Sequence, residues 1–391
     1  MDFEGLNESP IGRLVPITGT TARTGAAYNS FAYLPDPLPA SVDLSPATWT
    51  LVAAAEAAVA RLDQAASQVA VPALLRVPTI RREAQSTTAL EGTYAPLEDV
   101  LGPDGQDRQT PEALEVLNFV RVAEQAFAWP TKKALTAKAL SGLHKTLVDG
   151  TSSDGPDAGK LRDRQVFIGR PDAPIAQARF IPPPPGKPLA GALDDLLRWV
   201  NSPPTDMPSV VAAGLAHYQL ETVHPFSDGN GRIGRLLIVL QLIRHGVLAN
   251  PVLVVSPWFE RHQNEYHNEL LALSVSGDWD AWIRFFATGI ENSAMATAGL
   301  VAELLEWQSE TVAKARAAGV RGVAERVAGE LAGFPVLRAG WVAERHGATQ
   351  QAAMNALRRL TELEILEERA THGGRVFLAR EVMRMLTELH V

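Results

Sequence analysis

The sequence has no cysteine, no excess of basic charge and no long apolar run, and each absence excludes a class of protein. Without cysteine, neither disulfides nor thiolate metal sites can form, so stability has to come from core packing and the redox compartment stays open. No stretch of about 18 uncharged apolar residues is present, so we expect no membrane-spanning helix. The first 15 residues include acidic side chains and lack the basic and apolar regions of a secretory signal, so the cytoplasm is the expected location.

The balance of charges also limits the partners. The formal net charge of −8 and the sequence pI near 5.7 give no overall attraction to nucleic acid or to anionic membranes. The apolar fraction of 46% is ordinary for a globular protein, and 391 residues suggest two or three domains.

Helical periodicity dominates the chain up to about residue 290. Apolar residues at three- and four-residue spacing predict helices over residues 46–68, 78–90, 112–127, 133–148 and, with breaks, 188–290. Residues 20–46 are rich in Pro, Ser, Thr, Gly and Ala without periodicity, so they predict an irregular surface arm, with order beginning after it. Residues 165–181 combine β-branched residues with a Gly-Arg-Pro-Asp turn and predict a β-hairpin.

The last part of the chain changes character. Helical patterns near residues 322–332, 340–345 and 349–363 are followed by the strand-like ILEERA, the turn HGG and the strand-like RVFLA. This order predicts a winged helix-turn-helix. We therefore divide the chain into an N-terminal arm and helical region (residues 1–110), a helical core (111–315) and a winged helix-turn-helix domain (316–391).

The segment HPFSDGNGRIGR, from His224 to Arg235, concentrates polar groups between two apolar helical stretches. Gly229 and Gly231 allow main-chain N–H groups to approach an anion, and a helix beginning near Gly231 adds its first-turn N–H groups and partial positive charge. Arg232 and Arg235 are three residues apart, so their guanidinium groups can bind further phosphates from the first turn of this helix. These features predict a phosphate site.

The same segment supplies the other groups that phosphoryl or nucleotidyl transfer requires. Asn230 adds a side-chain donor, and Asp228 is a hard oxygen ligand that suits Mg²⁺ beside a nucleotide. His224 is a general base whose ordinary pKa lies near neutrality.

These residues admit other interpretations. The three glycines satisfy G-x-G-x-x-G, but no β-branched strand precedes them, and Val254 stands where a dinucleotide site needs an acid. Glu221 and His224 form half of a di-iron ligand pattern whose second half is missing. His217 and Tyr218 are interpreted as core residues. A purely structural, exposed connection is the remaining alternative.

The segment resembles the Fic motif, H-P-F-x-[DE]-G-N-G-R-x-x-R, at every defined position. Residues 115–126, 159–169, 178–185 and 277–286 are also similar to stretches of the Fic (Fido) family, so the resemblance spans roughly residues 38–290. It implies a mainly α fold, with a Fic-type helical core and a β-hairpin flap.

The resemblance implies a role for each position of the motif. His224 would deprotonate a target hydroxyl for attack on the α-phosphate of ATP, and Asp228 would hold Mg²⁺. Residues of the motif and one later tyrosine would bind ATP: Phe226, Gly229, Asn230, Gly231, Arg232, Arg235 and Tyr266. The flap would align the target by strand addition through Gln165, Val166, Phe167 and Ile168.

A second motif resembles the inhibitory pattern [ST]-x-x-x-E-[GN] of the same family. Thr87, Glu91 and Gly92 occupy its defined positions, far before the catalytic segment, which implies the class with an N-terminal inhibitory helix. Glu91 would pair with Arg235 and keep ATP from binding productively. Taken alone, Glu91 and Gly92 would be only a helix end with a glycine cap.

The resemblance thus implies a protein adenylyltransferase that transfers AMP from ATP to a Ser, Thr or Tyr hydroxyl of a protein target, releases pyrophosphate and is inhibited by Glu91. One alternative is hydrolytic removal of AMP at the same site, with Glu91 orienting water. Another is a DNA-binding regulator acting through the winged helix, although residues 336–391 carry eight Arg or Lys against seven Asp or Glu. Self-modification and homodimer formation stay open.

Overall fold

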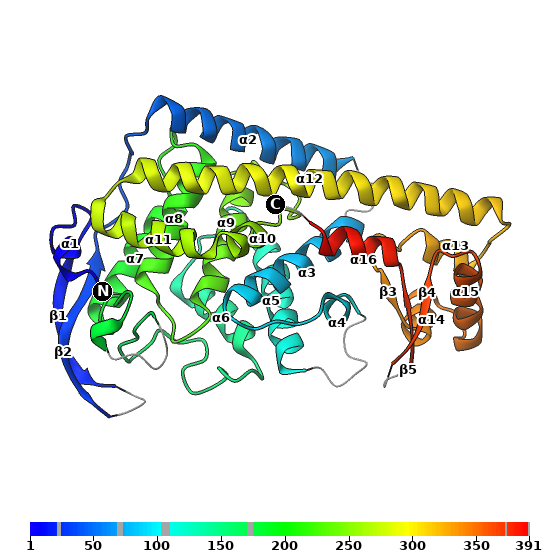
Figure 1. Cartoon of the computed structure of the whole chain (residues 1–391), viewed down its shortest axis with the longest axis horizontal. Coiled ribbons are helices and arrows are strands. Elements are labelled where there is room, and N and C mark those ends of the chain that lie inside the picture. Colours follow the sequence, from blue (N-terminus) through cyan, green and yellow to red (C-terminus); the bar gives the residue numbers. More distant parts are fainter. Residues whose placement is uncertain (22–24, 69–72, 103–109, 170–174, 372–373, 390–391) are drawn as a thin grey trace. The chain divides into compact units, whose positions relative to one another are not determined.

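Helices make up most of the described chain, as Figure 1 shows, and the expected mainly α fold is confirmed. The computed structural model describes residues 1–21, 25–68, 73–102, 110–169, 175–371 and 374–389. No helix within these ranges is both long enough and apolar enough to cross a membrane.

The elements of the N-terminal half are, in order, α1 (Phe3–Asn7), β1 (Gly12–Thr20), β2 (Ala27–Pro35), α2 (Pro46–Ser67), α3 (Ala73–Leu90), α4 (Leu97–Leu101), α5 (Pro111–Phe127), α6 (Ala137–Val148) and the short η1 (Ile175–Gln177). The central helices that follow are α7 (Lys187–Asn201), α8 (Ser209–Val223), α9 (Asn230–Arg244), α10 (Ser256–Arg261), α11 (Gln263–Ser276) and α12 (Trp279–Ala317). The last elements are α13 (Val323–Ala328), β3 (Val336–Leu337), α14 (Ala339–His346), α15 (Gln350–Glu362), β4 (Glu367–Thr371), β5 (Gly374–Leu378) and α16 (Arg380–Thr387).

The chain forms two compact units, each assembled from separated segments. The first unit comprises Met1–Ala57, Arg121–Leu248 and Phe259–Glu291. The second comprises Ala58–Val120, Ala249–Trp258 and Asn292–Val391.

Helices α8 and α9 form the centre of the first unit. Nearly every residue of both helices is buried, so they are apolar on all sides and have no solvent-facing stripe. Trp282 of α12 is fully buried beside them and donates its indole N–H to the carbonyl of Gly214, at 3.1 Å. The short connection between α8 and α9 is therefore held between two core helices.

The prediction of an irregular arm over residues 20–46 is wrong. Strands β1 and β2 form an antiparallel hairpin whose register runs from Gly12 opposite Pro35 to Thr20 opposite Ala27. Ile17 and Ala32 of this hairpin pack with Ala178 in one buried cluster. These strands depend on partners from distant sequence, which a local composition argument does not detect.

The flap consists of residues 165–169 and 178–181 in the described part of the chain. In place of the expected regular hairpin it has one antiparallel bridge between Ile168 and Phe180, with η1 inside the connection. The N–H of Ile168 donates to the carbonyl of Phe180 at 2.9 Å. The run Pro182–Pro185 offers no N–H donors, so a ladder cannot continue past this bridge. Residues 170–172 of the expected turn lie outside the described residues.

In the second unit, α3 begins at Ala73, earlier than the start predicted near Pro78. Pro78 lies inside the helix, where it lacks the N–H that would bond to residue 74. Three consecutive charged residues anchor the middle of α3. Arg81 donates to the carbonyl of Val100 at 2.7 Å, and Arg82 donates to that of Leu386 in α16 at 3.0 Å. Glu83 accepts the N–H of Ser256 at 2.8 Å, at the start of α10.

The C-terminal elements follow the predicted order. Helices α13, α14 and α15 precede the pair β4 and β5, and β3 completes a three-stranded sheet in the order β3-β5-β4. The β4–β5 register runs from Glu367 opposite Leu378 to Thr371 opposite Gly374. The assignment of this segment as a winged helix-turn-helix remains a prediction.

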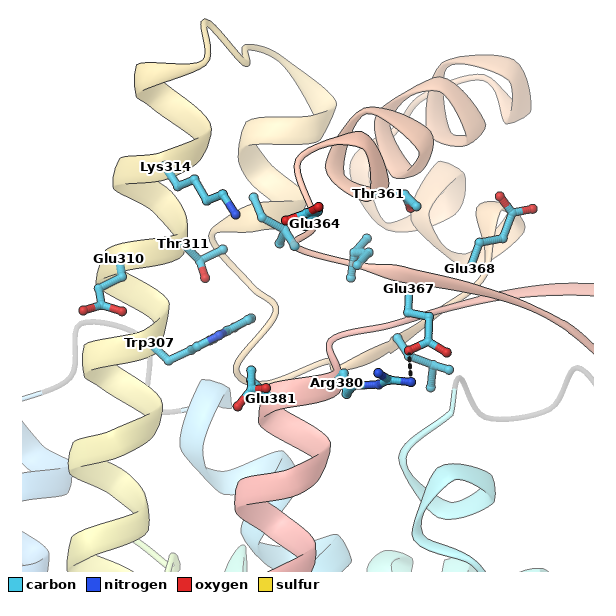
Figure 2. Close-up of a pocket in the computed structure, with 13 residues that line it drawn as sticks. Trp307, Glu310, Thr311, Lys314, Thr361, Glu364, Glu367, Glu368, Arg380 and Glu381 are labelled. Carbon is cyan, nitrogen blue, oxygen red and sulfur yellow. Dashed lines mark ion pairs between the residues drawn. The ribbon is translucent and has the colours of Figure 1, made fainter.

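A cleft of about 620 Å³ lies in this unit among α12, β4 and α16. Figure 2 shows Lys314 of α12 pointing toward Glu364, Trp307 of the same helix extending into the cleft, and an ion pair between Glu367 and Arg380. Although the lining is rich in glutamate, several of its carboxylates already have arginine partners, including that of Glu367 at 2.7 Å.

Candidate active site

The catalytic loop, residues 224–229, begins where α8 ends. His224 is the C-cap of α8 and adopts a left-handed conformation (φ 49°, ψ 62°), with its N–H donating to the carbonyl of Leu220 at 2.9 Å. In the described chain, His224 and Glu364 alone among non-glycine residues have positive φ. Such a conformation persists only where the surrounding structure fixes it.

Asn230 fixes the middle of the loop. Its side-chain oxygen accepts the N–H of Phe226 and its side-chain N–H donates to the carbonyl of Phe226, both at 2.9 Å. Asn230 is only 3% exposed. The structure therefore gives this side chain a role in shaping the loop, whereas its predicted contact with phosphate stays a prediction.

His144 of α6 holds the same loop from the other side, and the sequence reasoning missed it. Its ring stacks on Phe226, with centroids 4.0 Å apart and planes 5° from parallel. Its Nδ1 accepts the N–H of Gly159 at 3.0 Å, so the ring proton lies on Nε2 and is donated to the carbonyl of Asp228, also at 3.0 Å. Burial lowers the pKa of His144, which favours this neutral form.

The residues of the predicted anion site lie at the N-terminus of α9. Gly229 precedes the helix in the left-handed region (φ 75°), and the N–H of Ile233 donates to its carbonyl at 3.1 Å. The first-turn N–H groups of a helix have no acceptor within that helix, and they point outward with a partial positive charge. Asn230 and Gly231 lie in this first turn.

Gly229→Ala should lower the free energy of unfolding by about 1–2 kcal/mol, because a non-glycine residue is strained at this φ. A Cβ there would also lie 3.0 Å from Cδ2 of Leu147. Urea unfolding followed by circular dichroism measures the change.

Gly191→Ala, on the exposed face of α7 with no atom within 4 Å of the new Cβ, is the matched control. It should raise stability by about 0.5–1 kcal/mol. Equal effects at the two glycines would contradict the proposed constraint at Gly229.

Asp228 combines exposure with a preserved negative charge. Its side chain is 48% exposed, accepts the hydroxyl of Ser153 at 2.6 Å and pairs with Arg232 at 3.2 Å. Burial raises the pKa of Asp228, but the charge of Arg232 and the hydrogen bonds from Ser153 and the N–H of Gly229 outweigh it, so the pKa lies below its ordinary value. The carboxylate is therefore ionised at neutral pH.

One ionised carboxylate fits a magnesium ion that shares its remaining ligands with phosphates and water. Within the described ranges, no group of three or more His, Asp or Glu side chains is arranged to hold a metal ion by itself. Mg²⁺ at Asp228 would therefore depend on the nucleotide.

The two arginines of α9 are buried, at 3% and 2% exposure for Arg232 and Arg235. Because Arg232 is paired with Asp228, binding of a phosphate or a metal there would rearrange this ion pair. Arg232 lies in the first turn of α9, as predicted, whereas Arg235 lies in the second turn.

Tyr266, predicted near the adenine, is 1% exposed, and its hydroxyl lies 2.8 Å from Nε2 of His217. Burial and the charge of Arg235 lower the pKa of His217 to about 3, so this ring is neutral at physiological pH. Tyr218 is also buried and bonds to Ser274 through its hydroxyl, at 2.9 Å. His217 and Tyr218 are thus core residues, as interpreted from the sequence.

The flap is joined to the N-terminal hairpin. The N–H of Tyr33 donates to the carbonyl of Ile181 at 2.8 Å, and the ring of Phe167 packs edge-on against that of Tyr28 at 5.4 Å. Gln165 bridges the two arms of the flap by donating to the carbonyl of Pro182 at 2.9 Å. Val166 and Ile168, the other predicted flap residues, are partly exposed.

In the second unit, Glu91 and Gly92 terminate α3. The N–H of Gly92 donates to the carbonyl of Ala89 at 2.9 Å, and that of Thr93 donates to the carbonyl of Thr88 at 3.1 Å. With φ 90° at Gly92, these bonds form a Schellman motif in which Glu91 is the C-cap. Glu91 is exposed and its negative charge is unfavourable at the negative end of a helix, so capping alone does not explain its presence. Thr87 is fully buried.

Comparisons with known proteins point to one family. The Fic/DOC family model matches residues 134–242, which include the catalytic loop, and the Fic/DOC family N-terminal model matches residues 49–128, which include Thr87 to Gly92. The proteins named "Protein adenylyltransferase Fic" from Drosophila ananassae and Drosophila melanogaster are each 31% identical to this chain over 210 residues. That match covers 53% of this chain but only 38% of each relative.

A solved structure supports the fold. A Fic family protein from Desulfovibrio desulfuricans G20 matches with a TM-score of 0.55 and 23% identity, covering 86% of this chain and 97% of that one. Two family models thus match in their proper order along a chain that folds like a known Fic structure. The chain belongs to the Fic/DOC family.

Proposed function

We propose that the chain is a protein adenylyltransferase that transfers AMP from ATP to a hydroxyl of a protein target. The observation that carries the proposal is the junction of α8 and α9, where one short loop joins a half-buried histidine, His224, to a helix N-terminus that begins at Asn230 and is suited to phosphates. The relatives named protein adenylyltransferases support the same reaction.

His224 supplies the base. Its Nδ1 lies 3.3 Å from the carbonyl oxygen of Glu221, so a proton on Nδ1 is donated to that carbonyl and Nε2 keeps the lone pair. Nε2 takes the proton of the target hydroxyl as its oxygen bonds to the α-phosphorus of ATP. The bond between the α-phosphorus and the oxygen bridging to the β-phosphate breaks, and pyrophosphate leaves.

The N-terminus of α9 stabilises the negative charge on the phosphates. The main chain at Gly229 and Gly231, with Asn230, would bind the α-phosphate, and Arg232 and Arg235 would bind the outer phosphates. Mg²⁺, held by Asp228, would neutralise charge on the phosphates. Phe226, fully buried against His144, keeps the loop in shape.

Intact-mass measurement tests the reaction type. After incubation with ATP and Mg²⁺, the chain or a candidate target should gain the mass of one AMP. A gain equal to one phosphate would overturn the proposal, since it would show that the γ-phosphate is transferred.

Asp228→Ala should lower AMP transfer and remove most of its dependence on Mg²⁺, because the carboxylate is the expected metal ligand. Initial rates from α-labelled ATP across a Mg²⁺ titration measure this. Asp195→Ala, which removes a partly exposed carboxylate on α7, is the control and should leave the titration unchanged. An unchanged titration in Asp228→Ala would place the ligand elsewhere.

The remaining assignments are proposals of the same kind. Glu91, with Thr87 and Gly92, would inhibit the transfer, and the flap would align the target segment by strand addition. Residues 1–110, 111–315 and 316–391 would form the inhibitory region, the catalytic core and a winged helix-turn-helix. The order of α13 to β5 and the sheet order β3-β5-β4 support the last assignment.

A further inference from the structure

We propose that Arg162 is a positioning residue that couples the flap to the catalytic histidine. The inference rests on the proposed function, because it concerns how the target-binding flap and His224 are held in register. Nothing in the sequence marked Arg162 among the site residues, although it lies just before the flap in the segment GKLRDRQVFIG.

On one side, Arg162 holds the start of the catalytic loop. Its Nε–H donates to the carbonyl of His224 at 2.8 Å, and its main-chain N–H donates to that of Pro225 at 3.0 Å. One Nη2 hydrogen also points to the carbonyl of Val223, at 3.5 Å. These are the last carbonyls of α8 and the first of the loop, where a positive charge is favourable.

On the other side, the same guanidinium holds the bases of both flap arms. Nη2 donates to the carbonyl of Pro183 at 2.5 Å, beyond the second arm. Nη1 donates to the carbonyl of Arg164 at 3.3 Å, just before the first arm. One planar group therefore touches the catalytic loop and both ends of the flap.

Because Arg162 is buried, its hydrogen bonds constrain the carbonyl groups that accept them. The residue is only 2% exposed, and burial lowers its pKa to about 10, so it still carries its charge at neutral pH. Every hydrogen bond it makes within the described ranges ends on a main-chain carbonyl. A buried cation is costly unless all its donors are used, so the carbonyls around it are constrained to their positions.

The constraint falls on the strained residue of the site. His224 has φ 49°, and its carbonyl, which Arg162 holds, lies one bond beyond the Cα that carries the imidazole. If the bases of the flap moved, the guanidinium bound to them would move as well. It would then rotate the peptide plane between His224 and Pro225. The position of the target segment and that of the base are thereby linked.

Arg162→Lys is the first test, in the full-length chain. Lysine keeps the charge but has no planar fork, so it cannot reach the loop and both flap bases together. We expect kcat for AMP transfer to fall about 10²-fold while the Kd for ATP changes less than about threefold, since misplacement of a reacting group costs about this much. Arg198→Lys, with an exposed side chain on α7, is the matched control and should change neither quantity.

Amide hydrogen exchange tests the coupling without requiring activity. In Arg162→Lys, peptides covering Ile168 and Phe180 of the flap and peptides covering residues 223–229 should both exchange faster than in the parent. The reciprocal variant is Phe167→Ala, which removes the contact with Tyr28 on the outer side of the flap. It should speed exchange in the flap and, to a smaller degree, in the catalytic loop.

The coupling would be overturned by AMP transfer within twofold of the parent in Arg162→Lys, or by a catalytic loop whose exchange is unchanged when Phe167→Ala loosens the flap. Equal losses of ATP affinity and kcat would indicate a merely structural residue and also reject the proposal. If the parent transfers no AMP, the proposed function fails, but the exchange measurements still decide whether Arg162 links flap and loop.

Discussion

Replacing His224 with alanine should abolish AMP transfer while leaving ATP binding largely intact. The imidazole accepts a proton only during the attack, and the groups expected to bind the phosphates belong to α9. Loss of a general base costs on the order of 10²–10⁴ in rate. Initial rates from α-labelled ATP and titration calorimetry with ATP measure the two quantities.

His224→Asn is the more stringent variant. Asparagine tolerates the left-handed conformation of this residue (φ 49°) and can still donate an N–H toward the carbonyl of Glu221, but it is no base. It should keep more of the stability of the parent than His224→Ala and lose transfer equally. Near-parental labelling in either variant would show that another group takes the proton.

Glu91→Gly should raise AMP transfer tenfold or more. A factor of ten corresponds to about 1.4 kcal/mol, either in the activation free energy or in the free-energy difference between the unproductive and the productive pose of ATP. If Glu91 inhibits by withholding Arg235 from the outer phosphates, its removal restores a guanidinium to the nucleotide and removes a like charge. Because Gly92 carries the positive φ of the Schellman motif, a change at the preceding C-cap should leave the end of α3 intact. Self-labelling from α-labelled ATP measures the gain.

Two further variants separate charge from shape and test the role of Arg235. Glu91→Gln keeps the size of the side chain without its charge, and it should release most of the same activity. Adding Arg235→Ala to Glu91→Gly should remove most of the gain. An unchanged rate in Glu91→Gly, together with slower AMP removal from a modified target, would favour the hydrolytic alternative in which Glu91 positions water.

The sequence predicts most helices and the catalytic loop because their determinants are local. Periodicity placed α5 and α15 to within one or two residues, and the glycines and polar residues of the loop are contiguous. The strands β1 and β2 were missed because their buried residues pack against residues far along the chain, such as Ala178 and Ile181. The start of α3 predicted near Pro78 is wrong, because the helix begins at Ala73 and tolerates this interior proline.

The residues of the candidate site also fall into two groups, those with a local sequence pattern and those without one. Residues expected to bear reactive or phosphate-binding groups could be proposed from their spacing, whereas those that hold them in place could not. His144, Ser153 and Arg162 reach the loop from other parts of the fold, and their contacts are with main-chain carbonyls or with single side chains. Such contacts leave no local pattern in the sequence.

The segmented make-up of the two compact units has a consequence for the order of folding during synthesis. The hairpin of β1 and β2 is made well before the carbonyl of Ile181, which accepts the N–H of Tyr33. The first unit cannot close before Glu291 is made, and the second needs residues after Asn292. The nascent chain therefore carries an open strand edge through much of translation, a stage at which such edges are prone to aggregation. Slower elongation before residue 181 should lower the soluble yield more than slower elongation after residue 291.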